Sequence, residues 1–378
     1  MTKLFLTNRR RRLAVSTVIV SVIAISAIVV VLATASATAV ASGGLSATGA
    51  VYIIDNSATG NNVWVYPRSS NGQLGSGTAF STGGLGTGSA LASQGAVVLT
   101  QNGQWLLVVD AGSNQITVFS VDGISLVQAS ITSSQGSDPI SLAVSGNLVY
   151  VLDAGGSGNI AGFTLGHSGA LTFIPGSIQP LSGMASPSPE QIGFNPRGNV
   201  LIVTEKGTSI IDTYTVGPSG VASTPWSQTS AGSGPYGFAF TNQGRLIISE
   251  AASNSVSSYA VSNNGQLITI SGGMPTFGNA PCWLVVNGNS QFAFTANAHG
   301  GTISTFSISG DSTLTLMSSV AAHTAIPSLD MAFSYNSQFL YIRNGATITG
   351  FQVFPDGSIL SFTSVSGITA SASGLAAS

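Results

Sequence analysis

The chain has 378 residues, of which only 6% are charged, beside 47 glycines and 43% hydrophobic residues. Disordered proteins combine low hydrophobicity with high net charge, so this composition excludes disorder. Five of the ten basic residues lie within the first twelve positions, which leaves too few elsewhere to build a nucleic-acid-binding face. The single cysteine, Cys282, excludes a disulfide framework and a zinc site built on paired cysteines.

The N-terminal 41 residues have the pattern of an export segment. Four arginines at 9–12 precede an apolar run over 13–33, and small residues of the A-x-A type follow at 35–41. This order is typical of a secretory signal, and the apolar run is also long enough to span a bilayer. We expect residues 1–41 to form a helical signal peptide or a retained membrane anchor. The body, 42–378, would then be extracytoplasmic, either secreted or anchored through this segment alone.

The body carries all 12 acidic residues but only five basic ones, so it is mildly acidic. Carboxylates protonate near pH 4, and a surface that is poor in them changes little on acidification. The composition is therefore consistent with an acidic or otherwise harsh exterior.

A repeated strand pattern fills the body. Each copy has a short apolar strand, a polar turn, a second apolar strand, a Gly/Ser/Asn loop and a third alternating strand, as in 97–99, 105–110 and 116–119. The second strand ends in a polar or acidic residue, called the anchor residue below. It recurs seven times at intervals of 43 to 55 residues. The anchor residues are Asp55, Asp110, Asp153, Glu205, Glu250, Asn297 and Asn344.

This period is close to the ~40–50 residues of a four-stranded propeller blade. We expect an all-β fold, a seven-bladed β-propeller of four-stranded antiparallel blades over 42–378, with six or eight blades as the alternative. The first copy lacks an innermost strand, and 373–378 resembles 140–145. The C-terminus is therefore predicted to supply the first strand of the first blade and to close the ring.

Part of the repeat resembles a known family. The segments 234–240, 244–250 and 254–259 look like the lactonase-like seven-bladed propellers. That superfamily includes the YVTN-repeat proteins, bacterial 6-phosphogluconolactonase and the carboxymuconate-lactonising enzymes. The resemblance covers about 49–378 and implies a propeller fold and a lactone hydrolase activity.

The anchor residues are expected on one face near the axis, because every second connection of a blade returns to the same side. A circle of anchor side chains around the axis would form a pocket for a cation or a polyhydroxylated ligand. The alternative is that each anchor accepts backbone N–H bonds within its own loop. The candidate ligand-binding residues are Asp55, Asp110, Asp153, Glu190, Asn297 and Asn344.

A lactone hydrolase needs a base to activate water and a positive group to stabilise the oxyanion. The base would be Glu190, Glu205 or Glu250. The positive partner would be Arg343, His299 or His323, although Arg343 could instead pair with Asp330. The resemblance implies an Asn-Glu pair at the second-strand end, with Arg and His around the innermost strand. This chain departs from that pattern. It has Glu250 and Ala251 at the positions of the Asn-Glu pair, and Tyr236 and Thr241 where Arg and His are implied.

These observations favour an exported propeller that binds a small molecule, a carbohydrate or an envelope protein through its acidic face without catalysis. The alternatives are a lactone hydrolase that resembles 6-phosphogluconolactonase, and a structural or adhesion protein of the cell envelope. No metal, cofactor or nucleic-acid partner is expected.

Overall fold

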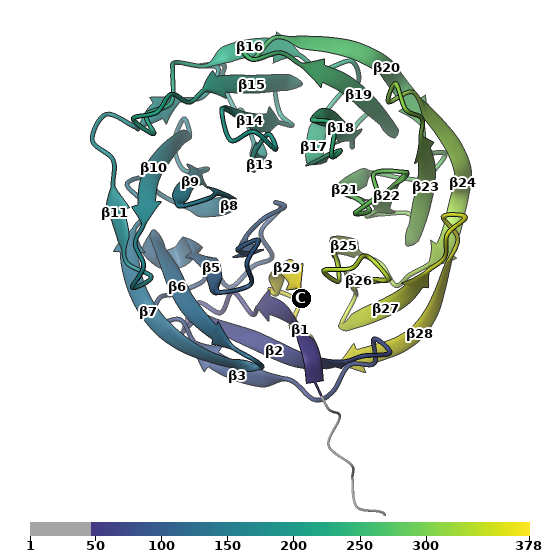
Figure 1. Ribbon diagram of the computed structural model, residues 1–378, viewed down its shortest axis with the longest axis horizontal. Helices are drawn as coiled ribbons and strands as arrows, with labels where there is room; N and C mark the ends of the chain where they lie inside the picture. Colours follow the sequence, from purple (N-terminus) through teal and green to yellow (C-terminus); the bar gives the residue numbers. More distant parts are fainter. Residues whose placement is uncertain (1–46) are drawn as a thin grey trace, which may run out of the picture. The chain divides into compact units, whose positions relative to one another are not determined.

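The computed structural model describes residues 47–378. Over this range the chain folds into seven antiparallel sheets that follow one another around a ring (Figure 1). The predicted all-β, seven-bladed propeller is therefore confirmed. The predicted export segment lies outside the described residues and stays a prediction. No helix in the described part of the chain has the length and apolar character needed to cross a membrane.

The blades are numbered here in chain order, with their strands taken from the axis outward. The first blade contains β29 (Ser373–Ala377), β1 (Ala47–Ile54), β2 (Asn62–Ser69) and β3 (Thr78–Ser81). The second contains β4 (Val97–Leu99), β5 (Trp105–Asp110), β6 (Gln115–Asp122) and β7 (Ser125–Ser133), with a short 3-10 turn at Ala111–Ser113. The third contains β8 (Pro139–Ser145), β9 (Leu148–Asp153), β10 (Asn159–Leu165), β11 (Leu171–Phe173) and β12 (Gln179–Pro180).

The remaining blades each have four strands. The fourth contains β13 (Pro189–Phe194), β14 (Val200–Glu205), β15 (Ile210–Thr215) and β16 (Trp226–Thr229). The fifth contains β17 (Pro235–Phe240), β18 (Arg245–Glu250), β19 (Ser255–Val261) and β20 (Leu267–Pro275). The sixth contains β21 (Pro281–Val286), β22 (Phe292–Asn297), β23 (Thr302–Ile308) and β24 (Leu314–His323). The seventh contains β25 (Ser328–Phe333), β26 (Phe339–Asn344), β27 (Thr347–Val353) and β28 (Ile359–Ser366).

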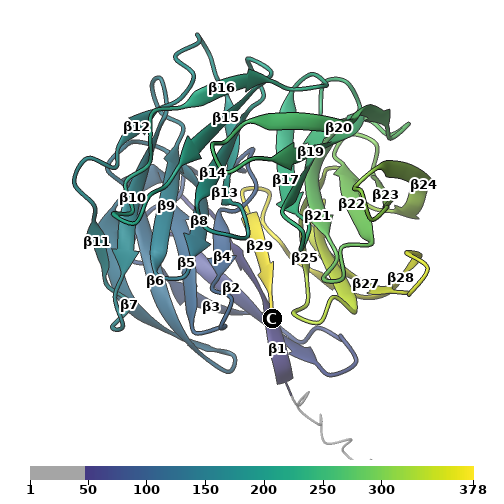
Figure 2. The same ribbon diagram turned by 45° about the horizontal axis from the view of Figure 1, so that its top comes forward.

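The two ends of the described chain meet in the first blade, as the sequence predicts. Figure 2 shows β29 beside β1, and the two strands pair antiparallel with Tyr52 opposite Ala376. The Ala50 backbone N–H donates to Ser378 Oγ at 2.8 Å, and the Ser378 N–H donates to the Ala50 carbonyl at 2.9 Å. The last strand in sequence therefore becomes the first strand in space and covers an otherwise open sheet edge.

The third blade departs from the expected four strands because its outer strand is broken in two. Both β11 and β12 pair with β10. Pro175 lies between them and has no N–H to continue the ladder, and Gly176 adopts a positive φ of 80°. Ser177 Oγ bridges the gap by accepting from the Gly162 N–H at 2.9 Å.

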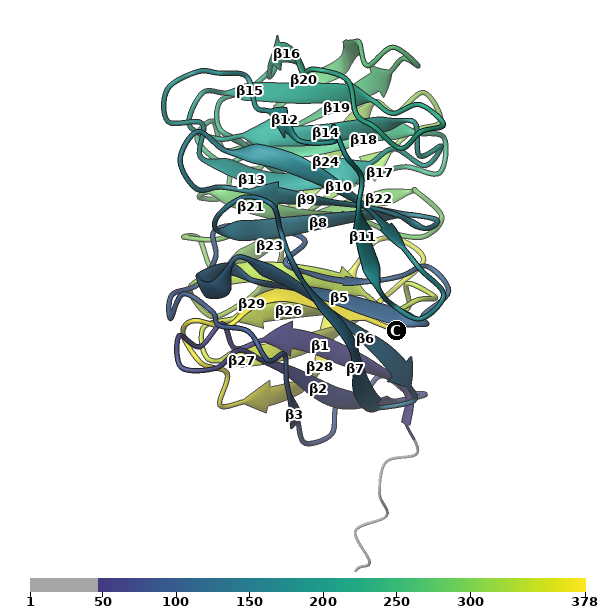
Figure 3. The ribbon, with the colours of Figure 1, turned by 90° about the vertical axis from the view of Figure 1, so that its left-hand side faces the viewer.

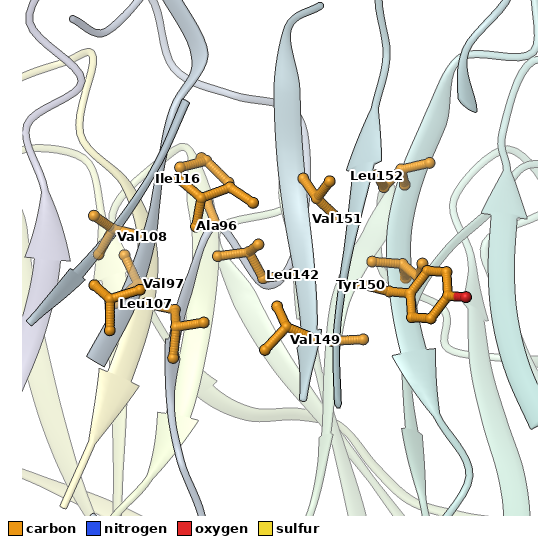
Figure 4. Packing of buried hydrophobic residues seen from close by; sticks show 14 of the residues in the cluster. Ala96, Val97, Leu107, Val108, Ile116, Leu142, Val149, Tyr150, Val151 and Leu152 are labelled. Carbon is orange, nitrogen blue, oxygen red and sulfur yellow. The ribbon is translucent and has the colours of Figure 1, made fainter. Parts of the chain in front are cut away.

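The core lies between neighbouring blades. The second strand of a blade, such as β5, is buried along its whole length because both faces of its sheet contact other blades. This explains the continuous apolar run of the second strands. Figure 4 shows Leu107 and Val108 of the second blade and Leu142 and Val149 of the third within one such cluster. Seen from the side, the strands run between two loop-bearing faces (Figure 3).

The innermost strands begin at a fixed register with the anchor residues. Pro139 lies opposite Asp153, Pro189 opposite Glu205, Pro235 opposite Glu250, Pro281 opposite Asn297 and Ser328 opposite Asn344. The start of each innermost strand and the end of its second strand therefore share one face of the ring, called the anchor face below.

A loop fills the middle of the ring. Residues 91–95, called the axial loop, reach inward from the connection between the first and second blades (Figure 1). Gln94 Nε2 donates to the Leu284 carbonyl at 2.9 Å, and the Leu284 N–H donates to Gln94 Oε1 at 3.0 Å. Ser93 Oγ donates to the Ile140 carbonyl at 2.8 Å, and the Ser93 carbonyl accepts from Trp283 Nε1 at 2.9 Å. The axial loop thus ties together innermost strands of several blades.

Candidate functional site

The anchor residues lie where the sequence predicts, at the ends of the second strands, and their side chains are buried. Asp110 shows the arrangement. It accepts hydrogen bonds from Asn61 Nδ2 at 2.9 Å, from Thr82 Oγ1 at 2.6 Å and from Thr117 Oγ1 at 2.6 Å. Thr117 belongs to the next strand of the same blade, whereas Asn61 and Thr82 come from the first blade. The side chain therefore joins two blades.

Glu250 has the richest set of partners. Ser230 Oγ and the Gly232 N–H donate to Oε1, at 2.8 and 2.7 Å, and Ser255 and Ser257 donate to Oε2, at 2.8 and 2.9 Å. A Cβ on Gly232 would collide with this carboxyl group, so only glycine lets the linking segment pass over it. Glycines and small hydroxyl residues in the links between blades are explained by this packing.

The remaining anchors are also buried and bonded near their own loops. Glu205 accepts from the Ser182 N–H at 2.9 Å and from Ser182 Oγ at 2.8 Å. Asn344 Oδ1 accepts from the Ala325 N–H at 3.2 Å. The exposed fractions are at most 8% for all seven residues, Asp55, Asp110, Asp153, Glu205, Glu250, Asn297 and Asn344.

The anchors therefore share one face of the ring, but their side chains do not point to the axis. A propeller sheet presents its edge to the axis and its faces to the neighbouring blades, so a second-strand side chain enters the seam between blades. This arrangement agrees in part with the alternative in which an anchor accepts backbone N–H bonds, because Asp110, Asp153 and Asn297 are bonded by side chains alone. The expected ring of carboxylates around an open pocket is not formed.

The positive candidates have different surroundings in the structure. His299 and His323 are both exposed, the first in the loop after β22 and the second at the end of the outermost strand β24. Arg343 is buried, and its Nη2 donates to the Thr369 and Ala370 carbonyls at 3.1 and 2.9 Å. Burial raises the pKa of Asp330 to about 7, and nearby Arg343 partly offsets this. The two residues form no direct ion pair within the described chain.

Glu190 is the one candidate that combines burial, a charged partner and a neighbouring hollow. It lies at the start of β13 with an exposed fraction of 1%, and Oε1 is 2.5 Å from Lys206 Nζ. The backbone brings these residues together, because the Lys206 N–H donates to the Ser188 carbonyl at 3.0 Å. The Ser188 hydroxyl donates to the same Oε1 at 3.3 Å, whereas Oε2 has no hydrogen-bond partner among the described residues.

Burial dominates the electrostatics around Glu190. It raises the pKa of Glu190 to about 7, although Lys206 and Ser188 favour the charged form. Lys206 Nζ also lies 5.3 Å from the ring centre of the buried Tyr236 on the next blade. The Cys282 thiol is buried too, which raises its pKa to about 12, so it stays protonated and is a poor nucleophile.

A hollow of about 550 Å³ opens beside Glu190 on the anchor face. Its walls come from the axial loop and from the loops that enter the third and fourth blades, and they include Asp138, Ser188 and Leu91. Burial raises the pKa of Asp138. Chemically, the hollow offers a carboxyl group that titrates near neutrality and is suited to activate water. The ammonium group of Lys206, which is suited to stabilise an oxyanion, pairs with this carboxyl group but does not itself line the hollow.

The sequence analysis found Glu190 but missed Lys206 and Tyr236. One signal was present, since Lys206 is the only lysine after residue 3. Its neighbour Glu205 was predicted as a site residue instead, because it occupies the anchor position of the repeat. The pairing follows from the antiparallel register of β13 and β14, where Pro189 lies opposite Glu205, together with the irregularity between Pro189 and Gln191.

A comparison with models of protein families identifies the family of this chain. A model of the lactonase family of seven-bladed β-propellers matches residues 50–185 and 246–332, which is more than half of the sequence. The chain belongs to this lactonase family. A search of curated proteins found no match.

Solved structures share the fold of this lactonase-family protein at low identity. A Lactobacillus plantarum protein has a TM-score of 0.72 at 15% identity, over 87% of this chain and 99% of its own. The periplasmic gluconolactonase of Pseudomonas aeruginosa has a TM-score of 0.69 at 17% identity, over 87% and 98%. A Bacteroides fragilis protein described as a 6-phosphogluconolactonase has a TM-score of 0.66 at 15% identity, over 87% and 98%.

The residues outside the family match include the candidate site. Glu190, Lys206 and Tyr236 all lie in 186–245, between the two matched segments of this lactonase-family protein. The match therefore supports the class of activity but assigns no role to these three residues. The evidence for a functional role of these residues is the geometry described above.

Proposed function

We propose that this protein is a lactone hydrolase that opens a cyclic ester in the hollow beside Glu190. The observation that carries the proposal is the pairing of the buried Glu190 carboxyl group with the partly exposed Lys206, with one carboxyl oxygen left without a partner among the described residues. Membership of the lactonase family supports this activity over binding without catalysis. Binding through an acidic face, the first expectation from the sequence, has less support because the anchor side chains are engaged between blades.

In the proposed reaction, the Glu190 carboxylate takes a proton from water while the water oxygen attacks the lactone carbonyl carbon. Lys206 stabilises the negative charge that develops on the carbonyl oxygen. The ring C–O bond then breaks, and the leaving alkoxide receives the proton from Glu190. The product is the open-chain hydroxy acid, and the carboxylate is regenerated. No metal or cofactor is used in these steps.

The proposed substrate is uncharged near its reacting group. Asp138 and Glu190 both line the hollow, and Lys206 is already paired with Glu190. A phosphoryl group would need further cations for binding. The location of the protein stays a prediction, with the body on the outer side of the membrane.

The proposal is tested by assaying residues 42–378 against a panel of sugar and aromatic lactones. Glu190→Gln removes the base while keeping the shape, so we expect a loss of kcat of at least 100-fold on whichever lactone is turned over. Lys206→Met removes the ammonium group, and a comparable loss is expected. Because the base must be deprotonated, kcat/KM of the unmodified protein should rise with pH through about 7.

The controls are Arg343→Ala, Glu205→Gln and Glu250→Gln, which alter the candidates chosen from the sequence. They should reduce stability, with kcat of the remaining folded protein close to the unmodified value. Turnover that survives Glu190→Gln, or turnover of no lactone by the folded protein, contradicts the proposal.

A further inference from the structure

The face of the ring away from the anchors carries two hollows that share one exposed tyrosine. This face, called the turn face, is formed by the turns between the first and second strands of the blades, such as 100–104 and 334–338. The larger hollow, of about 700 Å³, is lined by turns of the second, third and fourth blades. The smaller, of about 550 Å³, lies between the sixth and seventh blades. Tyr335 lines both.

Tyr335 is presented to solvent by a rigid turn. Its exposed fraction is 79%, and its hydroxyl makes no hydrogen bond to the described chain. Ser334 Oγ accepts from the Phe339 N–H at 3.1 Å, and Ser337 Oγ accepts from the Gly288 N–H of the sixth blade at 2.9 Å. These bonds hold the backbone of the turn to its own blade and to the neighbouring sixth blade, so the point from which the Tyr335 side chain projects is fixed before any ligand arrives.

Free amide groups line the same two hollows as the tyrosine. Gln101 and Asn147 line the larger hollow, and Gln338 and Gln352 line the smaller. All four are exposed, and their side chains make no hydrogen bond to the described chain. They contrast with Asn195 and Asn287, whose side chains are engaged by backbone N–H groups of their own turns. A free amide both donates and accepts, which suits hydroxyl groups.

The charge of the hollows narrows the class of ligand. None of the described residues that line either hollow is Asp, Glu, Lys or Arg, and the imidazole of His167 in the larger hollow is the one side chain in the two linings that can become a cation. A phosphate or carboxylate ligand would need cations there, and a cationic ligand would need carboxylates. An aromatic face beside free amides fits a ligand with apolar C–H faces and hydroxyl edges, which is the chemistry of a sugar ring.

We propose that the turn face binds a neutral glycan chain, with the Tyr335 ring stacked on one sugar unit between the two hollows. The amides of the larger hollow bind hydroxyl groups on one side of that unit, and those of the smaller hollow bind them on the other. This site is independent of Glu190, which lies on the anchor face.

The test is calorimetric titration of the full chain with cellohexaose, maltohexaose and chitohexaose. We expect at least one of these neutral hexasaccharides to bind. Tyr335→Ala should then lower the affinity at least tenfold, whereas Tyr335→Phe, which keeps the aromatic ring, should stay within about twofold. Gln101→Ala combined with Gln338→Ala should give an intermediate loss.

Matched controls separate this site from others. Phe277 is as exposed as Tyr335, at 78%, but follows β20 on the anchor face, so Phe277→Ala should bind normally. Glu190→Gln should also bind normally, whatever its effect on lactone turnover. Hexagalacturonic acid, which is charged, should not bind. The proposal is overturned if no neutral hexasaccharide binds at millimolar concentration, if Tyr335→Ala binds normally, or if Phe277→Ala causes the same loss.

Discussion

Glu205 and Lys206 are neighbours in the sequence with opposite surroundings. Glu205 enters the seam between blades and is bonded by Ser182, whereas Lys206 reaches Glu190 on the anchor face. Side chains alternate along a strand, so the residue that ends β14 and the residue after it point in different directions. The repeat pattern therefore singles out Glu205, which has a structural role, and gives no signal for Lys206, which pairs with the candidate catalytic carboxyl group.

The anchor carboxyl groups are expected to act on stability. Replacing Glu250 with Gln puts an N–H₂ group against hydroxyl and N–H donors that now point at an acceptor. Leaving these buried donors unsatisfied costs about 2–4 kcal/mol of unfolding free energy. Urea unfolding followed by circular dichroism measures it.

Asp122→Asn is the control for Glu250→Gln, because Asp122 is exposed at the end of β6 and should be neutral. An unchanged urea midpoint for Glu250→Gln would mean that this side chain does not hold the blades together. Glu250 would then become available again as a candidate catalytic base.

The closing strand is the element on which the ring depends. Besides its pairing with β1, it is held by Arg68, whose Nε donates to the Ser378 carbonyl at 2.8 Å. Its Leu375 and Ala376 are buried, and the preceding Ala370 carbonyl accepts from Arg343. Removing it would expose the edge of β1 and part of the core at once.

Deletion of residues 370–378 should therefore lower the melting temperature by at least 10 °C or prevent folding, on the order of several kcal/mol of lost burial and pairing. Differential scanning calorimetry makes the comparison. Leu360→Ser, on the exposed outer strand β28, is the control and should melt normally. A deletion variant that melts like the unmodified chain would show that the ring does not need its closing strand.

The axial loop shows how a connection can shape a site. It belongs to the longest interval between anchors, the 55 residues from Asp55 to Asp110. Its Gln94 N–H donates to the Glu190 carbonyl at 3.0 Å, so it also supports the start of β13. With the middle of the ring filled by the chain itself, the space for a ligand is displaced from the axis to the hollow beside Glu190.

The molecule as a whole buries carboxyl groups that are more easily protonated than free ones. Burial raises the pKa of Asp153, Asp212 and Asp330 to about 7, and Asp212 also lies against Glu205. In an unfolded chain these groups titrate near pH 4. Between pH 4 and pH 7 the folded state therefore binds more protons than the unfolded state.

Stability should consequently be highest near pH 4 and should fall as the pH rises through about 7, by on the order of a few kcal/mol per group. Urea midpoints measured from pH 4.5 to pH 9 test this. Asp212→Asn mimics the protonated acid, so it should stabilise the protein at pH 8.5 and flatten the profile. Asp311→Asn, at a fully exposed position, should leave the slope between pH 4.5 and pH 9 unchanged. A stability that rises with pH over this range contradicts the expectation.

This direction agrees with the acidic or harsh exterior suggested by the composition, but for a different reason. Because the surface has few carboxylates, acid changes its charge little. The buried carboxyl groups bind protons more tightly in the folded state than in the unfolded state, so acid stabilises the fold. The two faces of the ring also differ. The anchor face carries the Glu190–Lys206 pair, whereas the two turn-face hollows described above contain no Asp, Glu, Lys or Arg in their lining.

The number of blades, the closing strand and the position of the anchors could all be predicted from the sequence, because each follows from local alternation repeated at a regular interval. The direction of the anchor side chains could not, since it depends on which neighbour a sheet face meets. The Glu190–Lys206 pair, the axial loop and the exposed Tyr335 between two hollows were decided by tertiary structure. The axial loop and Tyr335 lie where non-repeating loops from different blades converge, and strand periodicity carries no information about such contacts. The Glu190–Lys206 pair lies at a repeated strand register, but its burial and its neighbouring hollow depend on the packing of loops around it.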